Sequence, residues 1–316
     1  MKLRRSLPLL LVVLLSAALA APATSGAYVV GIADQNPAFF DNAYLQQLAP
    51  IRTRYITPYD SVFKDRKTVD AWMDAARDAG MEVVVAFNPP EGMRCPNIGR
   101  ARGCRPVSGA AFKRAFLAFR KRYPQVRIYQ PWNEVNNLTQ PTARYPEAVV
   151  TYYQIVKANC PGCTVLGADL QDLPNLVSYG TRVLETFRRR RIRTPQVWGL
   201  HNYTDINRFI KDRNSSLRRA SRLLPGKIWL TETAGLFRFQ PQNARQSFRP
   251  DLNRQARAMA AIFKQGSLYR NKVARIYLYQ WFASPPTNRW DSAVLDNHGQ
   301  PRPVYSVLER YRVYFR

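Results

Sequence analysis

The 316-residue sequence contains few of the residues that usually bind metal ions. It has two histidines, His201 and His298, and no His-Glu-x-x-His motif. It also has no closely spaced acidic loop of the kind that binds calcium. Zinc sites need clustered histidine, cysteine or carboxylate ligands. The sequence therefore predicts no metal site and no cofactor.

Two glycine motifs that mark large enzyme classes are also missing. No Gly-x-Ser-x-Gly segment is present to form the nucleophile elbow of a serine hydrolase. No Gly-x-Gly-x-x-Gly segment follows an apolar run, so the fingerprint of a dinucleotide site is missing too. These absences argue against both classes.

Acidic residues are scarce, with 21 Asp and Glu against 48 Lys and Arg, which gives a formal net charge of +27. Such a charge raises the possibility of nucleic-acid binding. The basic residues are spread along the chain, however, and do not cluster with aromatic residues in a recognisable module, so nucleic acid is disfavoured as a partner. Two other interpretations stay open. One is compositional bias, with residues 188–191 forming a solvated helix end, and the other is attraction to an anionic glycan or cell envelope.

Long hydrophobic runs are absent beyond the N-terminus. Residues 1–20 combine Lys2, Arg4 and Arg5 with an apolar run and end in Ala18-Leu19-Ala20, a pattern typical of a cleaved secretory signal peptide. Loss of these three basic residues leaves a net charge of +24. The sequence thus predicts a signal peptide over 1–20, a short segment over 21–27 and one domain over 28–316, secreted and without a membrane span.

Only four cysteines are present, and they form two local pairs. Export makes disulfides permissible, so we expect Cys95 to pair with Cys104 and Cys160 with Cys163. The second pair has the spacing of a redox motif, but no thioredoxin-like context surrounds it. A structural disulfide in a turn is the better interpretation.

Eight apolar runs of strand length recur through the rest of the chain. They are nearly continuous in apolar residues, as expected of parallel strands that are covered on both faces. Eight such units in roughly 290 residues favour a closed (β/α)₈ barrel over an open sheet. The runs are 28–34, 55–59, 82–88, 128–133, 165–169, 197–202, 228–232 and 276–281.

Stretches with helical periodicity separate these runs. The alternation of strand and helix is what a parallel barrel requires. The expected helices cover 68–79, 110–123, 146–158, 176–188, 252–262 and 304–311.

Two of the expected strands end in a glutamate. Glu134 closes the fourth and Glu232 closes the seventh. In one parallel barrel, both side chains would lie at the carboxyl-end rim, where such barrels carry their chemistry. Paired carboxylates at that position are typical of glycoside cleavage, because one protonates the leaving oxygen while the other stays ionised beside the reacting carbon.

The segments around these glutamates resemble clan A of the glycoside hydrolases, with the closest motifs in families 39 and 5. The resemblance covers the whole mature chain and implies a (β/α)₈ catalytic domain over 28–316. It also implies retaining hydrolysis of O-glycosidic bonds, with Glu134 as acid/base and Glu232 as nucleophile. The residues that carry it are Trp132-Asn133-Glu134 with Asn136, and Thr231-Glu232 with Gly235.

The resemblance also implies contacts with the substrate. Asn133 would hydrogen-bond the sugar 2-hydroxyl, Tyr203 would orient Glu232, and Trp281 would form the floor of a sugar subsite. Trp132 is expected beside the cleft, where it would help to desolvate Glu134. The full expected set of substrate-binding residues is Arg54, Asn88, Trp132, Asn133, His201, Tyr203 and Trp281.

The distance between the two carboxyl groups carries a further expectation. A separation of about 5 to 5.5 Å is typical of retaining enzymes, whereas one nearer 8 Å would indicate inversion. We expect the shorter spacing.

The longest loops at the polar end, 89–107 and 235–250, are expected to shape the cleft. The second contains Arg238, Arg245 and Arg249, which could bind an acidic sugar or form a solvated loop. The substrate is therefore expected to be a carbohydrate, and its charge is left open. The main alternative function is a non-catalytic barrel that binds glycan or cell envelope through its basic surface.

Overall fold

The computed structural model describes residues 28–90, 93, 95, 104–240 and 247–316. The expected signal peptide lies outside these residues, so the signal peptide, the export and the domain boundaries stay predictions. Parts of both expected rim loops also lie outside them. None of the described helices is long and apolar enough to cross a membrane.

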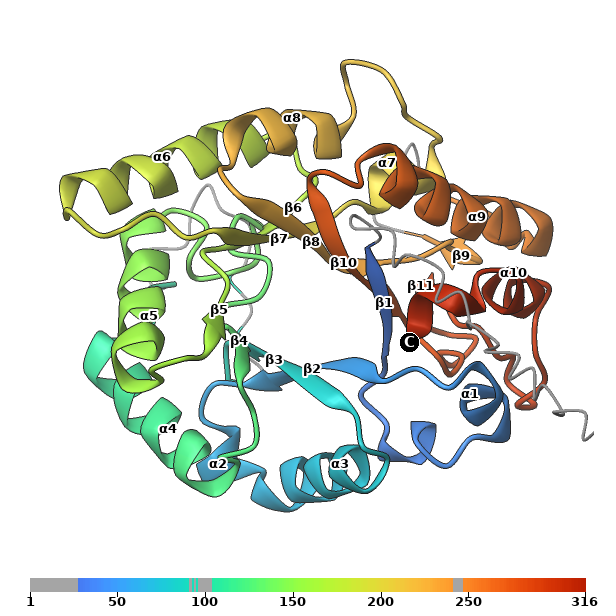
Figure 1. The fold of residues 1–316 in the computed structure, drawn as a ribbon, viewed down its shortest axis with the longest axis horizontal. Coiled ribbons are helices and arrows are strands. Elements are labelled where there is room, and N and C mark those ends of the chain that lie inside the picture. Colours follow the sequence, from blue (N-terminus) through green and yellow to red (C-terminus); the bar gives the residue numbers. More distant parts are fainter. Residues whose placement is uncertain (1–27, 91–92, 94, 96–103, 241–246) are drawn as a thin grey trace, which may run out of the picture.

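The described residues form the (β/α)₈ barrel that the alternation of strand and helix predicts. In the view of Figure 1, the strands form an inner ring and the helices surround it. The fifth strand is interrupted and consists of two short pieces. The barrel strands are β1 (Val29–Ala33), β2 (Arg52–Pro58), β3 (Glu82–Asn88), β4 (Ile128–Gln130), β5 (Thr164–Val165) with β6 (Asp169–Gln171), β7 (Val197–His201), β8 (Lys227–Thr233) and β10 (Val273–Tyr279).

Two parallel sheets make up the ring. One has the order β2-β3-β4-β5, and the other has the order β6-β7-β8-β10-β1. Because every ladder in the ring is parallel, the carboxyl ends of all its strands lie at one rim. Polar residues at these strand ends are thereby brought together.

The helices lie outside the ring. All those predicted from periodicity are present, and their ends differ from the predicted ends by only a few residues, except that α9 extends further at its C-terminal end. The short helices α1, α2, α7 and α8 were not predicted, because a few residues are too short to show a helical period. The helices are α1 (Ala43–Leu48), α2 (Ser61–Lys64), α3 (Arg66–Asp78), α4 (Gly109–Arg122), α5 (Pro146–Asn159), α6 (Leu176–Arg189), α7 (Tyr203–Asn207), α8 (Ser216–Leu223), α9 (Leu252–Leu268), α10 (Val304–Arg310) and the 3₁₀ turns η1 (Pro37–Phe39) and η3 (Arg312–Phe315).

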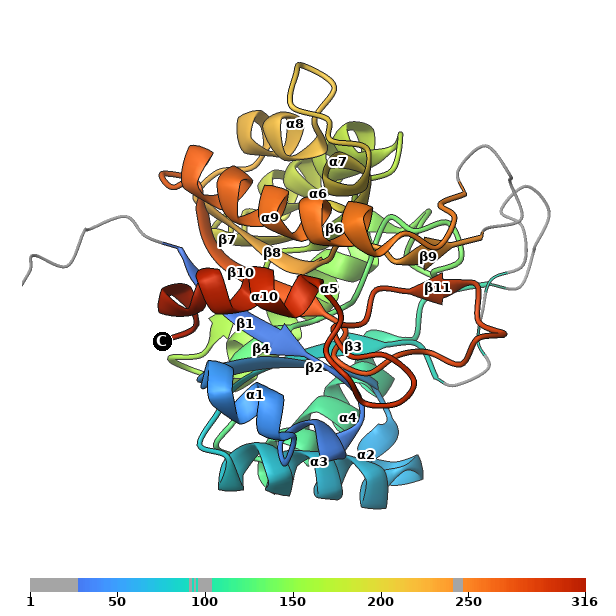
Figure 2. The ribbon, with the colours of Figure 1, turned by 90° about the vertical axis from the view of Figure 1, so that its right-hand side faces the viewer.

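Two further short strands, β9 (Arg238–Phe239) and β11 (Trp290–Asp291), pair antiparallel with each other. Figure 2 shows them beyond the end of the barrel toward which the strands point. They add a small hairpin-like wall to the rim that carries the candidate site.

The main hydrophobic core lies between the ring and the helices. Trp72, Phe87, Tyr129 and Trp198 are among its fully buried members. Phe87 packs edge to face against Phe112, Phe116 and Phe119 of α4. These contacts join β3 to α4 within the core.

Both expected disulfides are present. Cys95 is bonded to Cys104, and Cys160 is bonded to Cys163 in the turn between α5 and β5. The guanidinium of Arg120 on α4 contacts the Cys160 sulfur. This second disulfide is therefore part of the packing between two helices and a strand.

Gly31 allows β1 and β2 to approach closely where the two sheets meet. A Cβ at this position would lie 2.7 Å from the Arg52 carbonyl oxygen and 2.8 Å from the Tyr277 ring. Both neighbours belong to packed strands and have little room to move.

We expect Gly31→Ala to lower the free energy of unfolding by roughly 1 to 3 kcal/mol, as overpacking of a core typically does. Urea unfolding followed by circular dichroism measures it. Gly109→Ala, at the first residue of α4, is the control, since the nearest atom to its Cβ would be the Thr151 methyl at 3.2 Å. A control that loses as much stability as Gly31→Ala would contradict the explanation.

Candidate active site

Glu134 and Glu232 meet at the carboxyl-end rim. Glu134 follows β4, and Glu232 lies near the end of β8. One oxygen of each carboxylate and the His201 Nδ1 atom all lie within 4.8 Å of one another. The structure thus brings together the two glutamates that the sequence singles out.

A local backbone conformation directs Glu134 into this site. Its φ is 46°, in the left-handed region that non-glycine residues rarely adopt, at a cost of about 1 to 2 kcal/mol. Hydrogen bonds on both sides hold the segment, from Asn133 N to Phe87 O (2.8 Å) and from Val135 N to Asp169 O (2.9 Å). The neighbouring strands β3 and β6 therefore stabilise the turn that aims the carboxylate.

Arg54 on β2 connects several side chains beneath the glutamates. Its Nη1 donates to Glu232 Oε2 (2.8 Å), its Nη2 to Asn133 Oδ1 (2.6 Å) and its Nε to Gln130 Oε1 (3.1 Å). The side chain has no solvent exposure. Arg54 was expected to bind substrate, and this is corrected, because a guanidinium surrounded by protein acts as a positioning residue.

His201 lies between the two glutamates. Its Nδ1 is 3.1 Å from Glu134 Oε1 and 4.0 Å from Glu232 Oε1, and its Nε2 is 2.9 Å from Asp169 Oδ2. The strand register places it there, since His201 and Glu232 are direct neighbours across β7 and β8. The ring is fully buried, so the expected substrate contact is also corrected to a positioning role.

The surroundings of His201 favour its charged form. Burial alone would oppose the imidazolium, but the negative charges of Asp169 and then Glu232 outweigh this and raise the pKa of His201 to about 10. At neutral pH the ring is therefore a cation, with its Nδ1 bonded to Glu134 and its Nε2 paired by charge with Asp169.

Asp169 is the functional residue that sequence reasoning left out of the site. Burial opposes its ionisation, but His201, and after it Arg54 and the Thr231 hydroxyl, lower the pKa of its carboxyl. Arg54 Nη2 lies 3.7 Å away, and Thr231 Oγ1 donates to Oδ1. The only signal in the sequence was its place at the end of the fifth strand.

Gly199 makes room for this contact. It is the neighbour of Asp169 across β6 and β7. A Cβ at Gly199 would overlap the Asp169 carboxylate and approach Thr231 Oγ1 to 2.9 Å. The absence of a side chain is therefore what allows Asp169 and Thr231 to meet.

Tyr203, at the start of α7, hydrogen-bonds the other oxygen of Glu232. Its hydroxyl donates to Oε1 at 3.0 Å. Burial, and after it the charge of Glu232, raises the pKa of Tyr203 well above its usual value, so the phenol stays neutral and remains a donor. The orienting contact expected from Tyr203 is present in the structure.

Among the five charged side chains at the centre of the site, only those of the two glutamates reach solvent. The side chains of Glu134 and Glu232 are 17% and 11% exposed, whereas those of Arg54, His201 and Asp169 are at 0%. Asn137 Nδ2 donates to Glu134 Oε2 (2.9 Å) and fixes its outer oxygen. The two carboxylates can therefore contact a ligand, while the oppositely charged Arg54, His201 and Asp169 lie buried beneath them.

Two cavities flank the glutamates. One of about 580 Å³ is lined by Asn88, Asn133, Glu134 and Asn137 among others, and the buried Asn88 Oδ1 there has no hydrogen-bond partner. The other, of about 510 Å³, is lined by Tyr203 and Trp290 among others. The expected rim positions of Asn88 and Asn133 agree with the first cavity.

The two tryptophans expected in the cleft are placed elsewhere. Trp281 is 0% exposed and packs against Phe39 and Tyr305. Trp132 is 1% exposed and stacks on Tyr152 of α5. This corrects their expected placement, because both rings are large enough that packing under the helices buries more apolar area than a rim position.

A metal ion is a poor fit to the three groups that surround the centre. Glu134, His201 and Glu232 have ligand atoms within 4.8 Å of one another. However, the Arg54 guanidinium already pairs with Glu232, and its positive charge would repel a metal cation at this position. These three groups are therefore better suited to proton transfer and to the stabilisation of charge than to metal binding.

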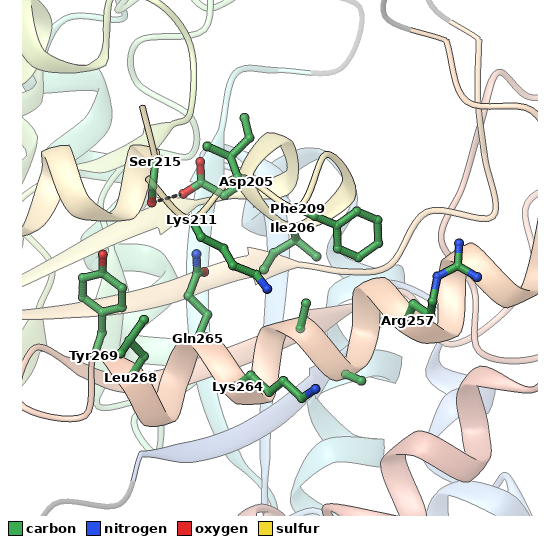
Figure 3. Close-up of a pocket in the computed structure, with 13 residues that line it drawn as sticks. Asp205, Ile206, Phe209, Lys211, Ser215, Arg257, Lys264, Gln265, Leu268 and Tyr269 are labelled. Carbon is green, nitrogen blue, oxygen red and sulfur yellow. Dashed lines mark hydrogen bonds between the residues drawn. The ribbon is translucent and has the colours of Figure 1, made fainter. Parts of the chain in front are cut away.

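A third cavity, of about 510 Å³, lies outside the ring between α7 and α9. Figure 3 shows Lys211, Lys264 and Arg257 around it, and the Ser215 hydroxyl bonded to Asp205. None of its lining residues belongs to the glutamate cluster. It is not part of the candidate site.

The charged state of His201 predicts how stability depends on pH. A histidine whose pKa is about 10 when folded and about 6.5 when unfolded stabilises the fold fully below pH 6.5, and this contribution is lost as pH rises toward 10. We expect the stability difference between the parent and His201→Gln to shrink over this range in urea unfolding. The exposed His298→Gln is the control, and a difference for His201→Gln that does not vary with pH would contradict the assignment.

No protein-family model and no curated protein sequence matches the chain. Solved structures match in fold. A GH10 endoxylanase retrieved from a sugarcane soil metagenome has 12% sequence identity and a TM-score of 0.61, over 91% of this chain and 97% of that one. A xylanase from Paenibacillus barcinonensis has 13% identity and a TM-score of 0.62, over 89% and 95%.

A family 39 glycoside hydrolase from Bacteroides cellulosilyticus WH2 is 15% identical, with a TM-score of 0.58. The match covers 91% of this chain but 63% of that protein. This protein and the xylanases resemble the present chain in fold. The chain therefore has the TIM-barrel fold of clan A glycoside hydrolases, and the resemblance indicated by its strand-end motifs is confirmed at that level.

Proposed function

We propose that the protein is a secreted glycoside hydrolase that cleaves O-glycosidic bonds of an oligosaccharide or polysaccharide. The observation that carries the proposal is the pair of solvent-reaching carboxylates at the barrel rim, with oxygens within 4.8 Å of each other. Xylanases and a family 39 glycoside hydrolase among the structures of similar fold support it. Export rests on the sequence of residues 1–20.

The spacing of the carboxylates supports a retaining mechanism. Inverting enzymes hold the two groups roughly 6.5 to 9.5 Å apart to admit a water, whereas retaining enzymes hold them about 5 to 5.5 Å apart. The nearest oxygens of Glu134 and Glu232 lie within 4.8 Å of each other, which supports the shorter spacing.

In the first step, a Glu232 oxygen attacks the anomeric carbon while Glu134 gives its proton to the leaving oxygen. The glycosidic bond breaks, and a glycosyl ester of Glu232 forms. In the second step, Glu134 takes a proton from a water that attacks the same carbon, and Glu232 leaves as a carboxylate. The two inversions restore the original configuration.

The buried residues support these steps. Arg54 and Tyr203 each hold one oxygen of Glu232, so the nucleophile is oriented without rearrangement. His201 Nδ1 and Glu134 Oε1 are 3.1 Å apart, so the ring orients the carboxyl that gives its proton in the first step.

The alternative of a non-catalytic glycan-binding barrel is not favoured. Such a barrel has no use for two facing carboxylates, and their oxygens are held by four donors, from Arg54, Asn137, His201 and Tyr203. Keeping these charges together has an electrostatic cost that binding a neutral glycan would not require.

The roles of the two glutamates can be tested separately. We expect Glu232→Gln to abolish release of reducing ends from xylan or another hydrolysed polysaccharide, because no nucleophile remains. Glu134→Gln should lower kcat/KM roughly 10² to 10⁴-fold on the polysaccharide, the usual contribution of a general acid. It should lower it far less on an aryl glycoside such as a dinitrophenyl glycoside, whose leaving group needs no proton.

Glu309→Gln, at an exposed position of α10, is the matched control and should keep the parent rate. Hydrolysis by Glu232→Gln at the parent rate would exclude the proposed nucleophile. Equal losses on both substrates for Glu134→Gln would exclude its role as the acid.

The stereochemical course is a further test. We expect proton NMR of the first product to show the anomeric configuration of the substrate, before mutarotation sets in. Appearance of the opposite anomer would mean that the carboxylates act by inversion.

A further inference from the structure

The two cavities beside the glutamates differ in chemistry. We call the cavity of about 510 Å³ the arginine pocket; its lining includes Tyr203, Arg208, Arg219, Phe248 and Trp290. We call the cavity of about 580 Å³ the amide pocket; its lining includes Gln35, Asn88, Asn133, Asn137 and Gln140. The arginine pocket reaches the site through Tyr203, which bonds Glu232, and the amide pocket is lined by Glu134 itself.

Arg219 is the main polar group of the arginine pocket. Its Nη2 donates to Ser216 Oγ (3.2 Å), but its buried Nε has no hydrogen-bond partner. A guanidinium N–H that is removed from water and not bonded is costly unless a ligand binds it. Guanidinium groups match carboxylates particularly well, because they offer parallel donors in one plane.

The backbone around Arg219 is held firmly. Arg219 lies on α8, whose first turn is capped by Asp205 through the backbone nitrogens of Ser216 and Leu217 at 2.8 and 2.9 Å. Ser215 also donates to Asp205. The helix, and with it Arg219, is thus fixed against α7, which begins with the Tyr203 that contacts Glu232.

Aromatic rings form the other side of the arginine pocket. Trp290 packs edge to face against Tyr203, with 4.7 Å between ring centres, and against Phe239 at 5.3 Å. Arg208 lies over the Phe248 ring, with its Cζ 5.2 Å from the centre. Partly exposed aromatic faces beside cationic groups suit a sugar ring that carries a negative charge.

The charge of the arginine pocket is positive on balance. Its only described acidic lining residue is Asp172, which accepts from Thr204 N (2.5 Å). With two arginines and one carboxylate among the described lining residues, the lining keeps a net positive charge.

The amide pocket has the opposite character. Among its described lining residues there is no lysine or arginine, and its two charged groups are the carboxylates Asp65 and Glu134. Amide and hydroxyl groups there suit the hydroxyls of a neutral sugar, whereas an acidic sugar would meet like charge.

We propose that the substrate is a mixed glycan, with an acidic sugar bound in the arginine pocket and neutral sugar in the amide pocket. This inference rests on the proposed function, and it specifies the substrate class. The net charge of +24 that remains after loss of the signal peptide would also attract such a glycan from a distance. Among the described residues, the arginines that line the pocket are Arg208 and Arg219, whereas Arg238 and Arg249 of the loop after β8 do not line it.

The test compares acidic glycans with the same glycans after reduction of each carboxyl to a primary alcohol, which removes the charge alone. Two probes cover the two possible placements of the acid. One is glucuronoxylan fragments, in which glucuronate is attached to a neutral chain, and the other is a polymer in which glucuronate alternates with a neutral sugar. Hydrolysis and calorimetric binding are measured for both forms.

We expect the parent to prefer one acidic probe over its reduced form by about tenfold or more in kcat/KM, the usual effect of a charged hydrogen bond. The ratio of kcat/KM for the acidic probe to kcat/KM for its reduced form should fall toward 1 in Arg219→Met. It should persist in Arg222→Met, which removes the same charge from an exposed position of the same helix. Because the preference is a ratio within one variant, partial loss of folded protein cancels. Arg208→Met is a second variant should Arg219→Met not fold.

The outcomes separate this inference from the proposed function. Hydrolysis without charge preference for either probe would overturn the inference and leave the function standing. Charge-dependent binding that Arg219→Met loses, without hydrolysis, would support the inference and overturn the function. A parent that neither binds nor hydrolyses the acidic probes would overturn the inference as well.

Discussion

The site depends on one buried ion cluster, in which Asp169 holds His201 and lies close to Arg54. These three side chains are fully buried and come from three different strands, β6, β7 and β2. Each charge would be too costly to bury alone. Because each is compensated by the others, the cluster fixes the two glutamates above it, and removing one member leaves an uncompensated charge in the barrel.

The barrel was predictable because its strands differ sharply from their surroundings. Nearly continuous runs such as 82–88 and 228–232 are required of parallel strands covered on both faces, and they recur eight times. Once the strands are parallel, the positions of Glu134 and Glu232 at one rim follow. What periodicity could not show were the short elements α7, α8, β9 and β11, which have too few residues to display a period.

The errors at the site have a common physical cause. Sequence position places a residue at a strand end but does not decide whether its side chain points to solvent, into the ring or under a helix. Trp132 and Trp281 pack under helices, where burial of a large ring is most favourable. Asp169 was overlooked because its function depends on partners distant in sequence, Arg54, His201 and Thr231.

The division between strands and loops explains why the reaction can be inferred more readily than the substrate. Glu134 and Glu232 lie at or just beyond the ends of barrel strands, whose geometry is shared with barrels only 12 to 15% identical in sequence. The residues that would contact the sugars beyond the cleaved bond, such as Arg219 and Trp290, lie on short elements of this chain's own loops. Changes in those loops can alter the charge of a pocket without disturbing the buried cluster, so substrate preference can diverge while the chemistry is kept.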